Sequence, residues 1–139
     1  LGATEVINSL GSNPVEVIIE KTRQMGVDRS FEAIGLEATL IQSLRALKKG
    51  GTATLLGIFE KGDAVLPVNL FVQREINLAG SQGYCWDFQD GLTLLENKAV
   101  DLKKLVTHRL NLDQLQQGFE SLLIPQNNAI KVVINIDTA

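Results

Sequence analysis

The sequence has 139 residues, enough for one domain or part of one. Hydrophobic residues make up 45% of it and charged residues 21%, a composition typical of a folded chain with a packed core and not of a disordered one. The net charge is −3 and Lys and Arg form no run, which argues against nucleic acid and anionic membranes as partners. The single cysteine, Cys85, excludes an internal disulfide and is typical of a cytoplasmic protein.

The apolar runs of the sequence are short and are typical of strands rather than membrane spans. The chain opens at Leu1 with neither a methionine nor a basic stretch. This start indicates an interior cut and not a signal peptide.

A short strand and a helix are the first predicted elements. Residues 4–8 (TEVIN) favour the strand. Asn13 is a good cap and Pro14 suits the first helical position, so a helix is predicted from there to about Met25, closed by Gly26.

The centre of the sequence is interpreted as strand, helix and strand. Residues 27–34 carry the β-branched and aromatic content of a buried strand, which ends at Gly35. Residues 37–49 place their apolar side chains on one helical stripe, and Gly50 and Gly51 are expected to stop that helix in the left-handed conformation. Residues 52–56 form the next buried strand, which ends at Gly57.

Two buried strands joined by a helix should be parallel, with a right-handed crossover. The alternation of strands and helices over residues 1–57 therefore predicts an open parallel sheet with helices on its faces. Ligands bind such sheets beyond the carboxyl ends of the strands. We expect the strand tips at Gly35, Gly57 and Gly80 to lie on one common edge.

The remaining segments contain further predicted helices and strands. Two helices are expected at 69–74 and 87–97, with a buried strand at 76–80 between them. A short extended piece at 104–109 precedes a helix at 112–123, where Asn111 and Gln114 can form a capping box. Residues 130–136 alternate between apolar and polar, which indicates a half-buried strand.

Six segments follow one another in the order and at the spacings of a known family: LGATEVIN, GVDRSFEAIG, LRALKKGGTATLLG, REINLAGS, LVTHRLNLDQLQQGFE and IKVVI. In this order the chain resembles, over essentially its whole length, the carboxyl-terminal part of the medium-chain dehydrogenases, the zinc-dependent alcohol and polyol dehydrogenases. The GIFEKG stretch and residues 74–84 are most similar to the sorbitol and butanediol branch. The resemblance implies hydride transfer between NAD or NADP and a small alcohol or polyol.

The resemblance also implies that parts of the enzyme lie upstream of Leu1: the Gly-rich dinucleotide fingerprint, the acidic residue that holds the ribose, and the Cys and His ligands of the catalytic zinc. No G-x-G-x-x-G follows a strand here. The implied fold is α/β, with a partial Rossmann-like parallel sheet. Residues 1–83 would be the back half of the nucleotide-binding domain, and residues 84–139 a segment that returns to the catalytic domain. No catalytic residue and no metal ligand is assigned to this chain.

The resemblance places eight residues near the coenzyme: Ile34, Gly35, Leu56, Gly57, Ile58, Ser81, Gly83 and Lys131. Gly57 and its neighbours match a turn against the nicotinamide, where a backbone without Cβ lets a flat ring approach. Ile34 and Gly35 match the adenosine side. Residues 80–83 match a segment whose backbone holds the carboxamide, and Lys131 matches a position near the pyrophosphate. The ordinary alternatives are strand-ending glycines, a plain loop and a solvated lysine.

Other distinctive residues receive no role in catalysis. His108 is the only histidine and has no Cys or carboxylate at ligand spacing, so a structural or exposed position is expected. Cys85 is interpreted as a small hydrophobe. Glu32 is a charge inside a strand, either paired near the site or at the strand edge. Trp86 is predicted to staple the start of a helix.

As a fragment, the chain is expected to be inactive alone and to bind NAD or NADP weakly or not at all. If residues 4–8 are the third strand of the order 3-2-1-4-5-6, their partner is missing, so they must stay loose or pair elsewhere. A homodimer or larger assembly is expected. A non-catalytic binding module and a zinc-free reductase of the same superfamily are the competing hypotheses.

Overall fold

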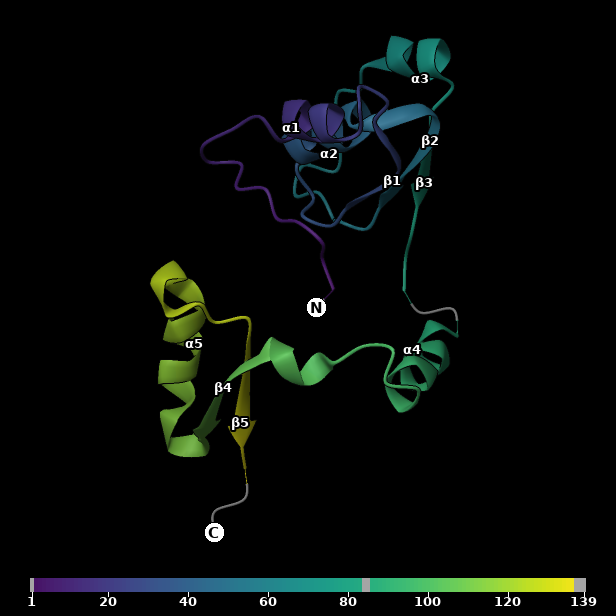
Figure 1. Ribbon diagram of the computed structural model, residues 1–139. Coiled ribbons are helices and arrows are strands. Elements are labelled where there is room, and N and C mark those ends of the chain that lie inside the picture. Colours follow the sequence, from purple (N-terminus) through teal and green to yellow (C-terminus); the bar gives the residue numbers. More distant parts are fainter. Residues whose placement is uncertain (1, 84–85, 137–139) are drawn as a thin grey trace. The chain divides into compact units, whose positions relative to one another are not determined.

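The computed structural model of the chain describes residues 2–83 and 86–136. These residues form two compact units, one of Thr4–Gly83 and a second that contains residues 86–136 (Figure 1). Cys85, which the sequence predicts to be a small hydrophobe, lies outside the described residues, as does Tyr84.

A parallel sheet forms the centre of the first unit (Figure 1). Its three strands lie in the order β1-β2-β3, with β1 at Val27–Glu32, β2 at Leu47–Leu55 and β3 at Asn77–Gly80. The helix α2 (Glu37–Arg45) connects β1 to β2, and α3 (Val68–Arg74) connects β2 to β3. The predicted α/β fold with parallel strands is confirmed.

The core of this unit lies where α2 meets the sheet. Leu40 and Leu44 are one helical turn apart on α2, and both are buried against Leu47 and Ala53 of β2. Ile76, just before β3, completes the cluster. Burial of a leucine side chain contributes about 1.5–3 kcal/mol, so these few residues hold the helix on the sheet.

The end of α2 differs from the prediction of a helix over 37–49. The helix stops at Arg45, and residues 47–49 already belong to β2. Gly50 has a left-handed φ of 75°, as expected, but it lies inside β2, where the register with β1 shifts. Leu47 explains the error, because an apolar side chain at this position fits the helical stripe as well as it fits the buried strand.

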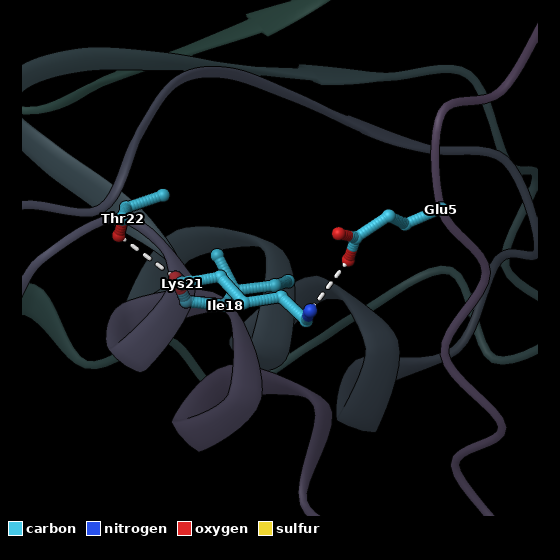
Figure 2. A network of polar contacts seen from close by, with 4 residues as sticks. All are labelled: Glu5, Ile18, Lys21 and Thr22. Atoms are coloured by element: carbon cyan, nitrogen blue, oxygen red, sulfur yellow. Dashed lines mark hydrogen bonds and ion pairs between the residues drawn. The ribbon is translucent and has the colours of Figure 1, made fainter.

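The predicted strand over residues 4–8 is wrong, since the structure has no strand there. The segment is linked to α1 (Pro14–Lys21) by an ion pair, in which Lys21 Nζ lies 2.8 Å from Glu5 Oε2 (Figure 2). An exposed pair of this kind contributes little to stability. Without a neighbouring strand, the backbone groups of this segment have no ladder to join.

The helix α1 begins as predicted and ends early. Asn13 caps it by accepting a hydrogen bond from Val15 N at 3.1 Å. The helix stops at Lys21 and not near Met25, because Thr22 ends the regular turns: its Oγ1 donates to Ile18 O at 2.8 Å (Figure 2) and accepts from Gly26 N at 2.9 Å.

The second unit contains a pair of parallel strands, β4 (Val106–Asn111) and β5 (Lys131–Asn135), joined through α5 (Leu115–Leu123). The helix α4 (Asp87–Glu96) precedes them. Gly118 lets α5 lie close to both strands, because a Cβ there would be 3.3 Å from Val132 Cγ1.

The predicted capping box is confirmed, with Asn111 N donating to Gln114 Oε1 at 3.1 Å, but it begins a 3-10 turn (Leu112–Gln114) that leads into α5. The half-buried strand predicted for 130–136 is confirmed as β5, although Val133 is half-buried like its neighbours Val132 and Ile134.

No helix within residues 2–83 and 86–136 combines the length and apolar character needed to cross a membrane.

Candidate functional site

The carboxyl ends of the three strands of the first unit meet at one edge of the sheet. In register, Glu32 lies beside Leu55, and Leu55 lies beside Gly80. Hydrogen bonds continue past the strands: Leu56 N and Gly57 N donate to Glu32 O at 2.8 and 3.1 Å, and Ser81 N donates to Leu55 O at 2.9 Å. The expected common edge is therefore present. We call it the strand-end rim and define it as residues 33–36, 56–58 and 81–83.

Glu32, the last residue of β1, is the only buried charged side chain in the described part of the chain, with 3% of its surface exposed. Its Oε1 accepts hydrogen bonds from Ile34 N at 3.0 Å, Gly35 N at 2.9 Å and Thr39 Oγ1 at 2.7 Å. Its Oε2 accepts a second bond from Gly35 N at 3.1 Å. The carboxylate thus joins the turn after β1 to the first turns of α2.

The charge of Glu32 is stabilised by neutral donors. Burial raises the pKa of this carboxyl group, but hydrogen bonds from Thr39 and from the backbone at Gly35 and Ile34 outweigh burial and lower the pKa below 4.5. None of the ion pairs among the described residues includes Glu32. A buried carboxylate with these donors therefore remains ionised at neutral pH.

The segments after β1 and β2 pack backbone against backbone. A Cβ at Gly57 would overlap Gly35 N and would lie 2.5 Å from Glu32 Oε2. A Cβ at Gly35 would overlap Ile58 O, and Gly35 also has a left-handed φ of 89°. Glycine at position 57 is thus required by the packing of the protein itself, because the space of the missing side chain is filled by Gly35 and Glu32. That the backbone at Gly57 also contacts a coenzyme ring stays a prediction.

The segment after β3 is different. A Cβ at Gly80 or Gly83 would meet nothing within 4 Å, and neither glycine has a left-handed φ. Side chains are therefore sterically possible at both positions. That the backbone of residues 81–83 holds a ligand stays a prediction.

Exposed apolar side chains cover the rim at the tips of β1 and β2. Ile34 is 65% exposed, Leu56 46% and Ile58 83%. The amides of Ile34, Gly35, Leu56 and Gly57 are already used in bonds to Glu32. A ligand at this edge would therefore meet an apolar surface more than a row of open donors.

A pocket of about 380 Å³ lies next to the rim, between the start of α2 and the loop after β2. It is lined by Gly35, Leu36 and Phe59 together with the carboxylates of Glu37, Glu60 and Asp63 and one cation, Lys61. This excess of negative charge does not suit a phosphate group.

The remaining candidates lie in the second unit. Lys131 is exposed at the start of β5, and its backbone O accepts a bond from Thr107 Oγ1 at 3.3 Å. His108 is half-buried, with Nδ1 3.0 Å from the same Thr107 Oγ1, which also accepts from Ile130 N at 3.0 Å. The contacts of Thr107 join β4 to β5, and His108 lies next to them, as expected for a histidine with a structural role.

No three His, Cys, Asp or Glu side chains of residues 2–83 and 86–136 come together as a metal ion requires. This part of the chain therefore does not fit the zinc ion that the sequence resemblance implies.

Sequence reasoning left the role of Glu32 open and missed Thr39. The signal for Glu32 was a charge within a strand, three residues before Gly35 and next to a predicted helix start. Nothing in the sequence marks Thr39, because a threonine in the first turns of a helix has several ordinary uses.

Comparison with known proteins gives consistent matches. The family model for zinc-binding dehydrogenases matches residues 1–97. An alcohol dehydrogenase of Cupriavidus necator is 33% identical over 138 residues, covering 96% of this chain and 37% of that protein. Sorbitol dehydrogenase of Bacillus subtilis is 31% identical over 134 residues, covering 96% of this chain and 38% of that protein.

The fold is also that of solved dehydrogenases. The crystal structure of 2R,3R-butanediol dehydrogenase from Bacillus subtilis superposes with a TM-score of 0.82 at 28% identity, over 94% of this chain and 38% of that one. The chain spans about 38% of the length of the relatives that it matches.

The backbone packing at the rim predicts unequal effects of two glycine substitutions. Gly57→Ala should destabilise the first unit by about 2 kcal/mol or more, because its Cβ would overlap the backbone of Gly35. Gly80→Ala is the matched control, since nothing lies within 4 Å of its Cβ. Amide hydrogen exchange in β1 and β2 measures both effects, and equal stability of the two variants would contradict the packing.

The lowered pKa of Glu32 predicts a loss of stability in acid. A carboxyl group whose pKa is lower in the folded state stabilises the fold above its unfolded value, and this contribution disappears as the pH falls through the folded value. The chain should therefore lose stability more steeply below pH 4.5 than Glu32→Gln does. Asp28, whose pKa Lys48 lowers, contributes equally to both proteins. The free energy of unfolding, measured in urea at several pH values, should fall more steeply with pH for the unaltered chain than for Glu32→Gln. Parallel curves for the two proteins would contradict the prediction.

Proposed function

The chain belongs to the zinc-binding dehydrogenase family, and from this premise we propose that it is part of a nicotinamide-dependent dehydrogenase. The whole protein would transfer a hydride between NAD or NADP and a small alcohol or polyol. The strand-end rim carries the proposal for this chain, because it places the tips of parallel strands at one edge, where such sheets bind their ligands.

The two units have different proposed roles. Residues 1–83 would form the back half of the nucleotide-binding domain. The order β1-β2-β3 supports this, because it corresponds to the last three strands of the order 3-2-1-4-5-6 and leaves one edge of β1 unpaired for the other half. Residues 84–139 would return to the catalytic domain. The zinc ligands would come from the rest of the protein.

The rim would hold the uncharged parts of the coenzyme. Exposed Ile34, Leu56 and Ile58 offer apolar contact to flat rings, with Gly35 and Gly57 setting their backbone. The ionised Glu32 beneath Gly57 would repel a phosphate. In this proposal the pyrophosphate is therefore bound elsewhere, with Lys131 as the cation this chain contributes.

Residues 81–83 complete the proposed coenzyme contacts. Ser81 N is bonded to Leu55 O, which leaves the Ser81 hydroxyl and the exposed backbone at Gly83 for the carboxamide.

The proposal predicts that the 139-residue chain alone does not oxidise alcohols. Residues 2–83 and 86–136 hold no group of side chains that fits zinc, and no G-x-G-x-x-G follows a strand in the sequence, so the affinity for NAD should also be weaker than micromolar. Absorbance of the reduced coenzyme at saturating sorbitol or butanediol checks the first point, and calorimetric titration checks the second. A longer product of the same gene, if active, is the positive control, and turnover by the short chain would refute the division of roles.

We also propose that the protein forms a homodimer or a larger assembly. The strand β3 lies at an edge of the sheet, and Asn77, Ala79 and Gly80 are exposed there. Unpaired strand edges favour addition of another strand. Light scattering should give at least twice the mass of one chain. Ser81 N points toward β2, so the neighbouring Gly80 N points to the open edge, and Gly80→Pro, which removes that donor, should reduce the mass. A monomer at all concentrations would exclude this assembly.

A further inference from the structure

We propose that Glu32 is a positioning residue of the coenzyme site, whose carboxylate sets residues 33–36 and, through them, residues 56–58. The inference rests on the proposed function, because these are the two segments that would contact the coenzyme. Glu32 would act without touching the coenzyme, since only 3% of its surface is exposed.

The first step is that the Glu32 carboxylate fixes the turn after β1 by hydrogen bonds. Both carboxylate oxygens accept from Gly35 N, at 2.9 and 3.1 Å, and Oε1 also accepts from Ile34 N at 3.0 Å. Gly35 is in the left-handed conformation, with a φ of 89°. A charged acceptor with several donors fixes this turn more firmly than a neutral one would.

The second step is the packing of this turn against the segment after β2, which makes the position of residues 56–58 depend on that of the turn. Gly35 and Gly57 are in backbone contact, and the carboxylate itself lies under Gly57, where a Cβ would be 2.5 Å from Oε2. Ile58 O is likewise packed against Gly35. A shift of the turn therefore forces a shift of residues 56–58, although residues 36 and 56, the nearest members of the two segments, are 20 positions apart in the sequence.

The third step is the anchor of the carboxylate. Thr39 Oγ1 donates to Oε1 at 2.7 Å and comes from α2, whose buried Leu40 and Leu44 fix the helix on the sheet. The core thus determines where the carboxylate lies, and the carboxylate determines where the rim lies. Thr39 is not itself a rim residue, although its Oγ1 also lies 2.9 Å from Leu36 O, so its substitution loosens the rim only through these two contacts.

Ser30 provides a matched control. It lies two residues before Glu32 on the same strand and also links β1 to α2, with Ser30 Oγ donating to Ser43 O at 3.1 Å. Within residues 2–83 and 86–136, Ser30 makes no hydrogen bond with the rim, so Ser30→Ala removes a comparable link between strand and helix. A purely structural role of Glu32 would give the two positions similar effects.

The experiment is a titration of the isotope-labelled 139-residue chain with NAD, followed by NMR at the amides of residues 34–35 and 56–58. Millimolar affinities are measurable in this way. We expect Glu32→Ala to weaken the apparent affinity about tenfold or more, as misplaced binding groups commonly do. Thr39→Val should weaken it about threefold, the cost of one hydrogen bond. Glu32→Gln should partly restore it, and Ser30→Ala should leave it unchanged.

A stability control separates positioning from loss of fold. Asn13→Ala lowers stability by removing the cap of α1 and leaves Glu32, α2 and the rim residues intact, so its affinity, measured on the folded fraction, should be unchanged. If Glu32→Ala does not fold, Thr39→Val and Glu32→Gln still decide the question. Equal affinities of Thr39→Val, Glu32→Gln and the unaltered chain would overturn the inference.

The same samples without NAD separate this inference from the proposed function. Thr39→Val should speed amide exchange and shift the resonances at residues 56–58 as well as at 34–35. If NAD moves no rim resonance of the unaltered chain, the proposed coenzyme contact fails, and exchange at residues 56–58 alone decides whether Glu32 links the two segments. Changes confined to residues 34–35 would refute the link.

Discussion

The contact between the Glu32 carboxylate, Gly35 and Gly57 is the constraint on which the rim depends. Two chain segments can cross backbone to backbone only where neither has a Cβ, and a buried charge can remain there only if donors surround it. Both conditions are met by residues of the turn itself and by Thr39. The apolar core beneath α2 then keeps these donors in place.

This arrangement divides the rim into two kinds of surface. Its interior is polar and closed, because the amides near Glu32 are already bonded. Its exterior is apolar and open at Ile34, Leu56 and Ile58. A flat ligand with uncharged faces matches the exterior, and a phosphate does not. This surface supports the proposal that the rim contacts the uncharged parts of a coenzyme.

The local sequence pattern predicted most of the elements of the first unit. It failed where the same residues fit two different structures equally well. The strands at 27–34 and 76–80 and the cap at Asn13 follow from side chains that have one good environment. Leu47 fits both a helical stripe and a buried strand, so the end of α2 was placed too late. Residues 4–8 have strand composition, but a strand exists only with a partner.

The sequence by itself determined the alternation of strands and helices, and hence a parallel sheet whose tips share one edge. It also determined the family, through the order and spacing of segments that no single motif could identify. Only the tertiary structure decided why glycine is needed at position 57 and what Glu32 does. The reason is that both depend on contact between segments that are distant in the sequence. The pattern of residues within one segment does not indicate which residues of another segment pack against it.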